Sequence, residues 1–380
     1  MSSLIIDNIE VFACKTDAPQ ITWARDMTPM FEANVIVRIT TEEGYEGVGG
    51  VLVPTEHSYD HSLVEAMKNL FPEILNKSIH DREKLTDHML TRCVGLNPNA
   101  VSPIDIAMWD CFAKSLNLPM YKVLGAKRDF IQSYASTPLF ETIEEYIDFI
   151  REQLSQGFKT VKFHTWCDIQ FDIKMVQEVC SAVPEMKYMI DCEQRYNKED
   201  ALKLGQKLDE LNFVWFEAPF VDSDFESYTW LKNKIKTPVI CAGNSILDPY
   251  LLKKAMEENV YDHLRIDTTY AGGITITKRI MEMAANLNFN VELQSWAFPL
   301  GQAANLHMML SNENCDFFEQ VVPFVDHEHG AKNFIRTDND GNIYPTKDNG
   351  LGITMNWDQI HQDYYLHLKF DKNGLSRNTQ

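Results

Sequence analysis

From about residue 131 onward the chain repeats one pattern: a short β-branched or aromatic run, a polar turn, then an amphipathic stretch. The runs end 23 to 27 residues apart, near Thr137, His164, Asp191, Glu217, Asn244, Asp267, Gln294 and Glu319. A strand, a turn, a helix and a return turn take roughly 25 residues. Eight such units predict an α/β fold, a closed (β/α)₈ TIM-type barrel. An open doubly wound sheet would tend to carry a glycine-rich loop after its first strand, and no G-x-G-x-x-G motif occurs there.

The first third of the chain has a different pattern. Residues 4–13 and 33–40 alternate as half-buried strands do, and 42–47 (EEGYEG) predicts a hairpin turn. Helical patterns follow at 58–77, 82–92 and 102–116, and the polar segment after about residue 320 is expected to fold back onto this N-terminal sheet. We therefore expect an α+β capping domain over 1–128, a barrel over 129–322, and a C-terminal segment, 323–380, that returns to the cap.

The charge balance excludes two classes of partner. The 380 residues include 55 Asp and Glu against 35 Lys and Arg, a formal net charge of -20. Nucleic acids and anionic membranes both need a basic face, so neither is expected as the main partner. No apolar stretch is long enough for a signal peptide or a membrane span, and the 8 cysteines include no C-x-x-C pair. We expect a cytoplasmic protein with reduced cysteines, a small-molecule substrate and a homo-oligomeric state.

Ionisable side chains gather at the predicted strand ends, where barrel enzymes place their catalytic groups. Residues two apart on a strand share a face, so Lys162 with His164 and Asp191 with Glu193 can point into one cavity. For Lys162 the alternative is a strand-end salt bridge, and for His164 a hydrogen bond to a neighbouring loop. An ammonium close to carboxylates has its charged form favoured, so Lys162 is expected to act electrostatically and not as a base.

Oxygen-bearing side chains end three successive strands. Asp191, Glu217 and Asn244 carry the ligand type that Mg²⁺ prefers. Each acid alone is equally typical of a solvated loop in so acidic a chain, whereas the three together predict a metal site.

Seven segments carry a resemblance to a known family. They are SPIDIAMWDCFAKSLNLPMYKVLGA at 102–126, VKFH at 161–164, MIDCEQ at 189–194, WFEAP at 215–219, AGNSI at 242–246, LRIDTTYAGGITITKRIMEMA at 264–284 and NGLGITMNWD at 349–358. In their order and intervals they resemble the enolase superfamily, in its mandelate racemase and muconate-lactonizing branch. The resemblance implies abstraction of the proton α to a carboxylate, with Mg²⁺ stabilising the enediolate. Such a proton is too weakly acidic for a side-chain base unless a metal and cationic donors stabilise the product.

The resemblance also implies roles for individual residues. Lys162 would neutralise the carboxylate or enediolate, and His164, where relatives often have the second lysine of a K-x-K, would be the base. Two departures stand out. Asn244 occupies a position where relatives usually have Glu or Asp, for which Glu193 can compensate, or else act as a second acid. Gln294 stands where racemase-type relatives have a histidine paired with the sixth-strand aspartate, here Asp267.

Because glutamine cannot take a proton, one-base chemistry is favoured: proton abstraction followed by β-elimination. We therefore expect an acid-sugar dehydratase, or a cycloisomerase that opens an anhydro or lactone sugar acid. His164, Tyr270 and Glu319 remain candidates for the acid that protonates the leaving oxygen. The alternatives are a racemase or epimerase that uses Lys162 and another base, and a barrel that binds metal and ligand without turnover.

Substrate specificity in this family resides in loops of the capping domain, here about 16–32 and 50–61. Candidate substrate contacts in these loops are Trp23, Arg25 and His57, and Trp296 follows the seventh predicted strand. An ordinary surface or interface position is the alternative for each loop residue.

Overall fold

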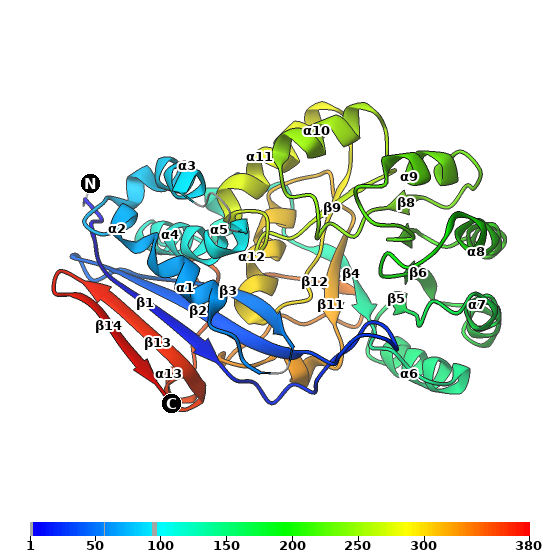
Figure 1. Cartoon of the computed structure of the whole chain (residues 1–380), viewed down its shortest axis with the longest axis horizontal. Helices are drawn as coiled ribbons and strands as arrows, with labels where there is room; N and C mark the ends of the chain where they lie inside the picture. The colour runs from blue at the N-terminus through cyan, green and yellow to red at the C-terminus, as the bar shows by residue number, and fades with distance from the viewer. Residues whose placement is uncertain (1–2, 57, 93–96) are drawn as a thin grey trace.

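The computed structural model describes residues 3–56, 58–92 and 97–380. An antiparallel sheet with its helices lies on one side of the molecule and a ring of parallel strands surrounded by helices on the other (Figure 1). None of the helices in these ranges combines the length and apolar composition needed to cross a bilayer.

The antiparallel sheet joins the two ends of the chain. Its order is β14-β13-β1-β2-β3, built from β1 (Ile6–Cys14), β2 (Phe31–Thr41), β3 (Glu46–Thr55), β13 (Tyr364–Asp371) and β14 (Gly374–Thr379). β2 and β3 meet at the predicted hairpin, where Gly44 has a φ of 83°. β1 lies between β2 and β13, with Val11 opposite Leu368. The predicted return of the C-terminal segment to the N-terminal sheet is thus confirmed.

One face of this sheet packs against the helices α1 (Ser62–Lys68), α2 (Phe71–Ile74), α3 (Arg82–Arg92) and α4 (Ser102–Ser115), and the short α5 (Met120–Val123) follows and packs against α4. α4 approaches β3 so closely that a Cβ at Gly47 would lie 2.0 Å from the carbonyl oxygen of Ala107. The single helix expected over 58–77 is divided into α1 and α2, because Pro72 in the first turn of α2 has no N–H to continue α1. The predicted loop 50–61 is also partly wrong, since 50–55 belong to β3.

The predicted barrel is present. Its strands are β4 (Ile131–Ser136), β5 (Thr160–His164), β6 (Lys187–Asp191), β7 (Phe216–Glu217), β8 (Val239–Ile240), β9 (Leu264–Ile266), β10 (Val291–Leu293) and β11 (Phe317–Val321). β4 to β8 pair in sequence, β9 pairs with β10, and a bridge from Ile240 to His263 connects β8 to the start of β9. The parallel pairing of β11 with β4 closes the ring.

Helices cover the outside of the ring (Figure 1). They are α6 (Ile143–Ser155), α7 (Ile169–Ala182), α8 (Lys198–Leu211), α9 (Phe225–Lys232), α10 (Pro249–Glu257), α11 (Gly273–Asn286) and α12 (Pro299–Leu310). Most of them have one buried face, whereas every residue of the last one, Pro299–Leu310, is buried. Side-chain caps begin several of them: Thr142 and Glu145 form a capping box at α6, and the Asp168 side chain caps α7. After β11 the chain forms a 3₁₀ turn, η3 (Phe324–His327), then β12 (Asn342–Ile343), which pairs with β4, and α13 (Trp357–Asp363).

Candidate active site

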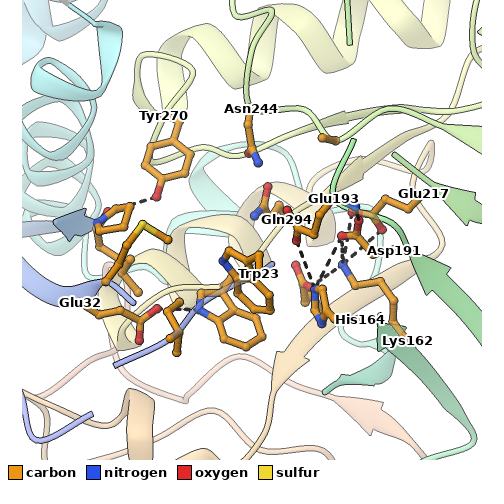
Figure 2. Close-up of a pocket in the computed structure, with 17 residues that line it drawn as sticks. Trp23, Glu32, Lys162, His164, Asp191, Glu193, Glu217, Asn244, Tyr270 and Gln294 are labelled. Atoms are coloured by element: carbon orange, nitrogen blue, oxygen red, sulfur yellow. Dashed lines mark hydrogen bonds and ion pairs between the residues drawn. The ribbon is translucent and has the colours of Figure 1, made fainter. Parts of the chain in front are cut away.

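A cavity of about 210 Å³ lies where the carboxyl ends of the barrel strands face the cap (Figure 2). Parallel strands bring their C-terminal residues to one edge, so side chains from distant parts of the sequence meet there. The barrel contributes Lys162, His164, Asp191, Glu193, Glu217, Ala242, Asn244, Tyr270, Gln294, Trp296 and Glu319, and the cap contributes Ile21, Trp23, Met30, Glu32, Leu52 and Pro54.

Lys162 is buried among three carboxylates. Its Nζ lies 3.2 Å from both oxygens of Glu217, 3.4 Å from Asp191 Oδ2 and 3.0 Å from Glu319 Oε1. Burial and the nearby Arg265 oppose its charge, but Glu217 and Glu319 outweigh them and the pKa of Lys162 is raised. The side chain is therefore a fixed ammonium and is unsuited to act as a base.

A second buried cation, Arg265 on β9, was missed by sequence reasoning. Its Nε lies 2.6 Å from Glu217 Oε1 and its Nη2 lies 2.8 Å from Glu319 Oε2, while Nη2 also donates to the Tyr134 hydroxyl. The available signal was an arginine between two apolar residues in the short strand Leu264–Ile266, where alternation directs it to the opposite side from its neighbours. Together with Lys162 it balances the acids inside the barrel.

His164 ends β5 and presents one ring nitrogen to the cavity. Its Nδ1 lies 2.5 Å from the carbonyl oxygen of Thr137. A carbonyl only accepts, so Nδ1 carries the hydrogen and Nε2 of the neutral ring has a free lone pair. Nε2 lies 3.6 Å from Asp191 Oδ2 and 3.9 Å from Glu193 Oε1. Burial and Lys162 lower the pKa of His164 to about 4, which keeps the ring neutral at physiological pH.

Two tryptophans enclose the imidazole. The ring centroid of Trp23 lies 4.5 Å from that of His164, and the ring of Trp296 stands edge-on to it at 5.6 Å. Trp23 and Trp296 also contact each other, with centroids 4.8 Å apart. Cap and barrel thus supply the two aromatic walls that limit the access of water to His164.

Three carboxylates share the side of the cavity that holds Lys162. Asp191 and Glu217 are register partners on β6 and β7, and Glu193 follows two residues after Asp191. Burial raises the pKa of Glu217 to about 8, with Arg265 opposing and Asp191 adding to the rise. Burial and Asp191 also raise the pKa of Glu193, whereas Lys162 and His164 overcome burial and keep the pKa of Asp191 low.

This crowding of buried carboxylates is what an additional cation would relieve. Ligand atoms of His164, Asp191 and Glu193 all lie within 4.8 Å of one another. Glu217 borders the same space, although Lys162 and Arg265 already hold both of its oxygens. Because most of these donors are oxygens, the arrangement fits a hard divalent cation.

Asn244 lines the cavity but lies apart from that cluster (Figure 2). The strand expected to end near Asn244 ends at Ile240. The buried carboxylate of Asp222 accepts the backbone N–H groups of Ala242, Gly243, Asn244 and Ser245 and so holds this segment as a loop. The Asn244 side chain is consequently exposed on that loop.

The two polar residues expected from the sixth and seventh strands occupy different positions. Gln294 lines the cavity, and its Oε1 has no hydrogen-bond partner among the described residues. Asp267 lies behind it and does not line the cavity; its Oδ1 accepts from Thr269 N at 2.7 Å and from Asn305 Nδ2 at 3.1 Å. Asn305 Nδ2 also donates to the Gln294 carbonyl at 2.7 Å. Asp267 is thus connected to the cavity-lining Gln294 through Asn305.

Tyr270 and Glu319 line the cavity with their polar groups already bonded. The Tyr270 hydroxyl donates to the carbonyl of Leu52 on β3 at 3.2 Å. Glu319 accepts from Ser136 Oγ and Ser295 N, both at 2.8 Å, besides its contacts with the two buried cations. These contacts outweigh burial and lower the pKa of Glu319. Glu319 is therefore a permanent carboxylate that cannot donate a proton.

The cap residues divide into those that reach the cavity and those that do not. Trp23 lines it, whereas Arg25 does not: Arg25 is exposed, pairs with Glu141 at 2.8 Å and lies 4.4 Å over the ring of Trp166. His57 lies outside the described residues. Glu32, which sequence reasoning missed, accepts from Trp296 Nε1 at 2.8 Å.

Comparison with known families agrees with this geometry. Residues 145–359 match the family described as enolase C-terminal domain-like, and residues 9–125 match the N-terminal domain of mandelate racemase / muconate lactonizing enzyme. The chain belongs to the enolase superfamily. Within it, these two matches place the chain in the mandelate racemase and muconate-lactonizing branch.

Similar enolase-superfamily proteins span nearly the whole chain. L-talarate/galactarate dehydratase of Salmonella typhimurium is 26% identical over 360 residues, covering 90% of this chain and 86% of that protein. The crystal structure of a putative mandelate racemase/muconate lactonizing enzyme from Pseudovibrio sp. has a TM-score of 0.95 at 34% identity, covering 98% of this chain and 100% of that one. The crystal structure of D-glucarate dehydratase from Agrobacterium tumefaciens complexed with magnesium has a TM-score of 0.82 at 25% identity, covering 96% of this chain and 100% of that one.

Proposed function

We propose that this chain is a magnesium-dependent acid-sugar dehydratase, which removes the proton α to a carboxylate and then eliminates the oxygen on the β carbon. The observation that carries the proposal is the pairing of a neutral His164, whose Nε2 faces the cavity, with a glutamine, Gln294, in place of a second base. The talarate/galactarate and D-glucarate dehydratases among its relatives support the substrate class.

Asp191 and Glu217 would hold the magnesium ion, with Glu193 or Asn244 supplying a further oxygen. Support comes from the raised pKa of Glu217, about 8, and of Glu193, since both reflect buried carboxylates crowded by Asp191. The D-glucarate dehydratase relative was crystallised with magnesium. Bound magnesium supplies a Lewis acid beside the substrate carboxylate.

In this proposal His164 Nε2 takes the α proton, because Thr137 fixes the hydrogen on Nδ1. Lys162 adds positive charge next to the substrate carboxylate, and Glu217 and Glu319 hold it in place. Trp23 and Trp296 exclude water from the imidazole.

The remaining cavity residues bind the substrate hydroxyls. The unpartnered Oε1 of Gln294 would accept a hydroxyl hydrogen, and Asp267 positions Gln294 through Asn305. Glu193 and Tyr270 face the same space and would contact further hydroxyls.

His164 would also return its proton to the leaving oxygen in a syn elimination. Glu319 is unsuited to that step because it stays ionised, and the Tyr270 hydroxyl is directed to Leu52. Of the three candidates for this acid, His164 is the one that remains, since it gains a proton during the reaction and faces the substrate.

The test is a panel of aldonic, aldaric, uronic and anhydro sugar acids, incubated with Mg²⁺ in D₂O and analysed by product NMR. A 2-keto-3-deoxy product supports the dehydratase. A ring-opened isomer without loss of water identifies a cycloisomerase, which the same one-base site would serve. Exchange with inversion and no keto product identifies an epimerase, and thermal stabilisation without exchange identifies a binding protein.

We further propose a cytoplasmic homo-oligomer, with a cap over 1–128, a barrel over 129–322 and a returning segment over 323–380. The cysteines that the structure describes are free thiols, which fits a reducing compartment. Light scattering after size exclusion measures the number of protomers, and a monomer would contradict the oligomer.

A further inference from the structure

A second cavity, of about 230 Å³, adjoins the first behind Trp23 and Trp296. Ile21, Trp23, Glu32 and Trp296 line both cavities, so the two spaces share one wall. The second cavity extends from that wall to Trp166 and to His327 on η3. A ligand seated at His164 would therefore have room to continue past the two tryptophans.

Glu32 and His327 supply buried polar atoms to this second cavity. Glu32 is 1% exposed and His327 is 4% exposed. Glu32 Oε2 and His327 Nε2 lie 3.3 Å apart, within ion-pair range of each other, whereas His327 Nδ1 makes no hydrogen bond to any described residue. Buried polar groups without partners are costly, and in native proteins they generally have one. His327 Nδ1 therefore needs a partner that the described residues do not provide, and the carboxylate oxygen Glu32 Oε2 can accept a further hydrogen bond beside it.

The other walls are flat and largely apolar. Trp23, Trp166 and Trp296 present indole rings, and Pro138, Leu139 and Pro323 fill the spaces between them. Among the described residues that line this cavity none is lysine or arginine, so it does not favour an anionic group. Aromatic faces that pack against C–H bonds, together with groups that bond hydroxyls, match the chemistry of an uncharged sugar ring.

The volumes of the two cavities also indicate a ligand that occupies both. Each cavity, at about 210 and 230 Å³, is smaller than the roughly 300 Å³ at which ligand pockets usually begin, whereas the two together are larger than that. The carboxylate of the ligand belongs beside Lys162 in the first cavity, since that is where the cavity cation lies.

We propose that the second cavity is a subsite for a neutral sugar unit attached to the sugar acid, with Glu32 and His327 bonding its hydroxyls. The substrate class would then include disaccharide acids, whose acid end reaches His164 and whose neutral end passes Trp23. This inference rests on the proposed function for the identity of the acid end.

Binding of paired probes to the magnesium-loaded protein tests the subsite. Gluconate is compared with maltobionate, cellobionate and lactobionate, its 4-O-glycosylated forms, by isothermal titration calorimetry. We expect at least one of the three to bind about tenfold more tightly than gluconate, the gain typical of one or two good hydrogen bonds. If none binds more tightly than gluconate, the subsite is refuted.

Variants test whether any gain in affinity over gluconate comes from the second cavity. Trp166 and His327 line the second cavity and not the first, so Trp166→Ala and His327→Gln should each remove the advantage of the disaccharide acid and leave gluconate binding within about twofold. Leu139→Trp, which fills the cavity without removing a bonded group, should do the same and covers the case in which the other variants fail to fold. Trp230→Ala, on α9 and outside both linings, is the matched control for loss of a tryptophan. A gain that survives Leu139→Trp would overturn the assignment.

Failure of the subsite and failure of the proposed function can be told apart. Suppose that no acid in the D₂O panel is turned over, but a disaccharide acid still binds more tightly than gluconate and loses this advantage in Trp166→Ala. The subsite is then supported and the dehydratase function is refuted. If monosaccharide acids are dehydrated and no disaccharide acid binds more tightly, the reverse holds.

Discussion

His164 Nδ1 lies 2.5 Å from the carbonyl oxygen of Thr137, which places the ring hydrogen away from the cavity and the lone pair of Nε2 toward it. His164→Asn keeps an N–H donor near the position of Nδ1 but has no counterpart of Nε2. We expect kcat to fall by about 10² to 10⁴, the usual contribution of general acid–base catalysis, with Mg²⁺ affinity and Tm retained. The measurement is α-deuterium exchange by NMR.

The control for this variant is His88→Asn, on the exposed side of α3, where the ring pairs with Glu73. It should leave exchange unchanged. If His164→Asn exchanges the α proton at the wild-type rate, the imidazole is not the base.

The pH profile should reflect the same residue. A base acts in its unprotonated form, and burial with Lys162 lowers the pKa of His164 from the ordinary 6.5 to about 4. As pH falls through 6.5, kcat/KM should therefore hold, and the acidic decline should come only below that value. A profile that halves at pH 6.5 or higher would show that the imidazole is solvated and not enclosed by Trp23 and Trp296.

Asn244→Asp should strengthen magnesium binding. The change adds a negative charge to a side chain that lines the cavity, and ligand charge is a main determinant of affinity for hard cations. We expect the Kd for Mg²⁺ from calorimetry to fall by about tenfold. Ser245→Asp, the adjacent exposed position outside the lining, is the matched control. If Ser245→Asp lowers the Kd for Mg²⁺ as much as Asn244→Asp does, the gain comes from added negative charge on the loop and not from a ligand oxygen at position 244.

Arg265→Met should destabilise the fold strongly. It leaves Glu217 and Glu319 buried without one of their cations, and breaking a buried ion pair costs about 3 to 5 kcal/mol. The free energy of unfolding in urea measures this. Arg25→Met breaks the Glu141 pair, in which both side chains are more than 60% exposed, and should cost about 0 to 1 kcal/mol.

A double change gives the prediction for Arg265 a second test. Because the cost of Arg265→Met comes from unpaired carboxylates, adding Glu319→Gln should recover part of it. If Arg265→Met is no more harmful than Arg25→Met, the network contributes little to the stability of the barrel.

The sequence predicted the barrel because its strands are mostly buried and most of its helices are amphipathic, and these two patterns alternate along the chain at a regular interval. It also placed His164, Asp191 and Glu217 correctly at strand ends, where the ladder between neighbouring strands determines which way a side chain points. Loop positions were less predictable. The exposed position of Asn244 depends on its contact with Asp222, and no motif in the sequence indicates that contact. Arg25 pairs with Glu141, which is distant in the sequence.

The burial of two charged residues was the other feature that was not predicted from the sequence. Arg265 and Glu32 are paired with residues from other strands or from the C-terminal segment, so their burial follows from tertiary contacts that alternation alone does not reveal. An arginine within a short apolar strand is nevertheless a signal that could have been used, whereas Glu32 is the second residue of β2, beside a loop, and gives none.

The pairing of β1 with β13 affects how the protein is made. Residues 6–14 leave the ribosome early but acquire their neighbour at 364–371 only after the whole barrel has been translated. Protein segments generally fold in the order of their synthesis, and this sheet is an exception. The strand that leads into the Trp23 segment therefore gains its second neighbour only in the last stage of biogenesis, after the barrel beneath that segment has been synthesised.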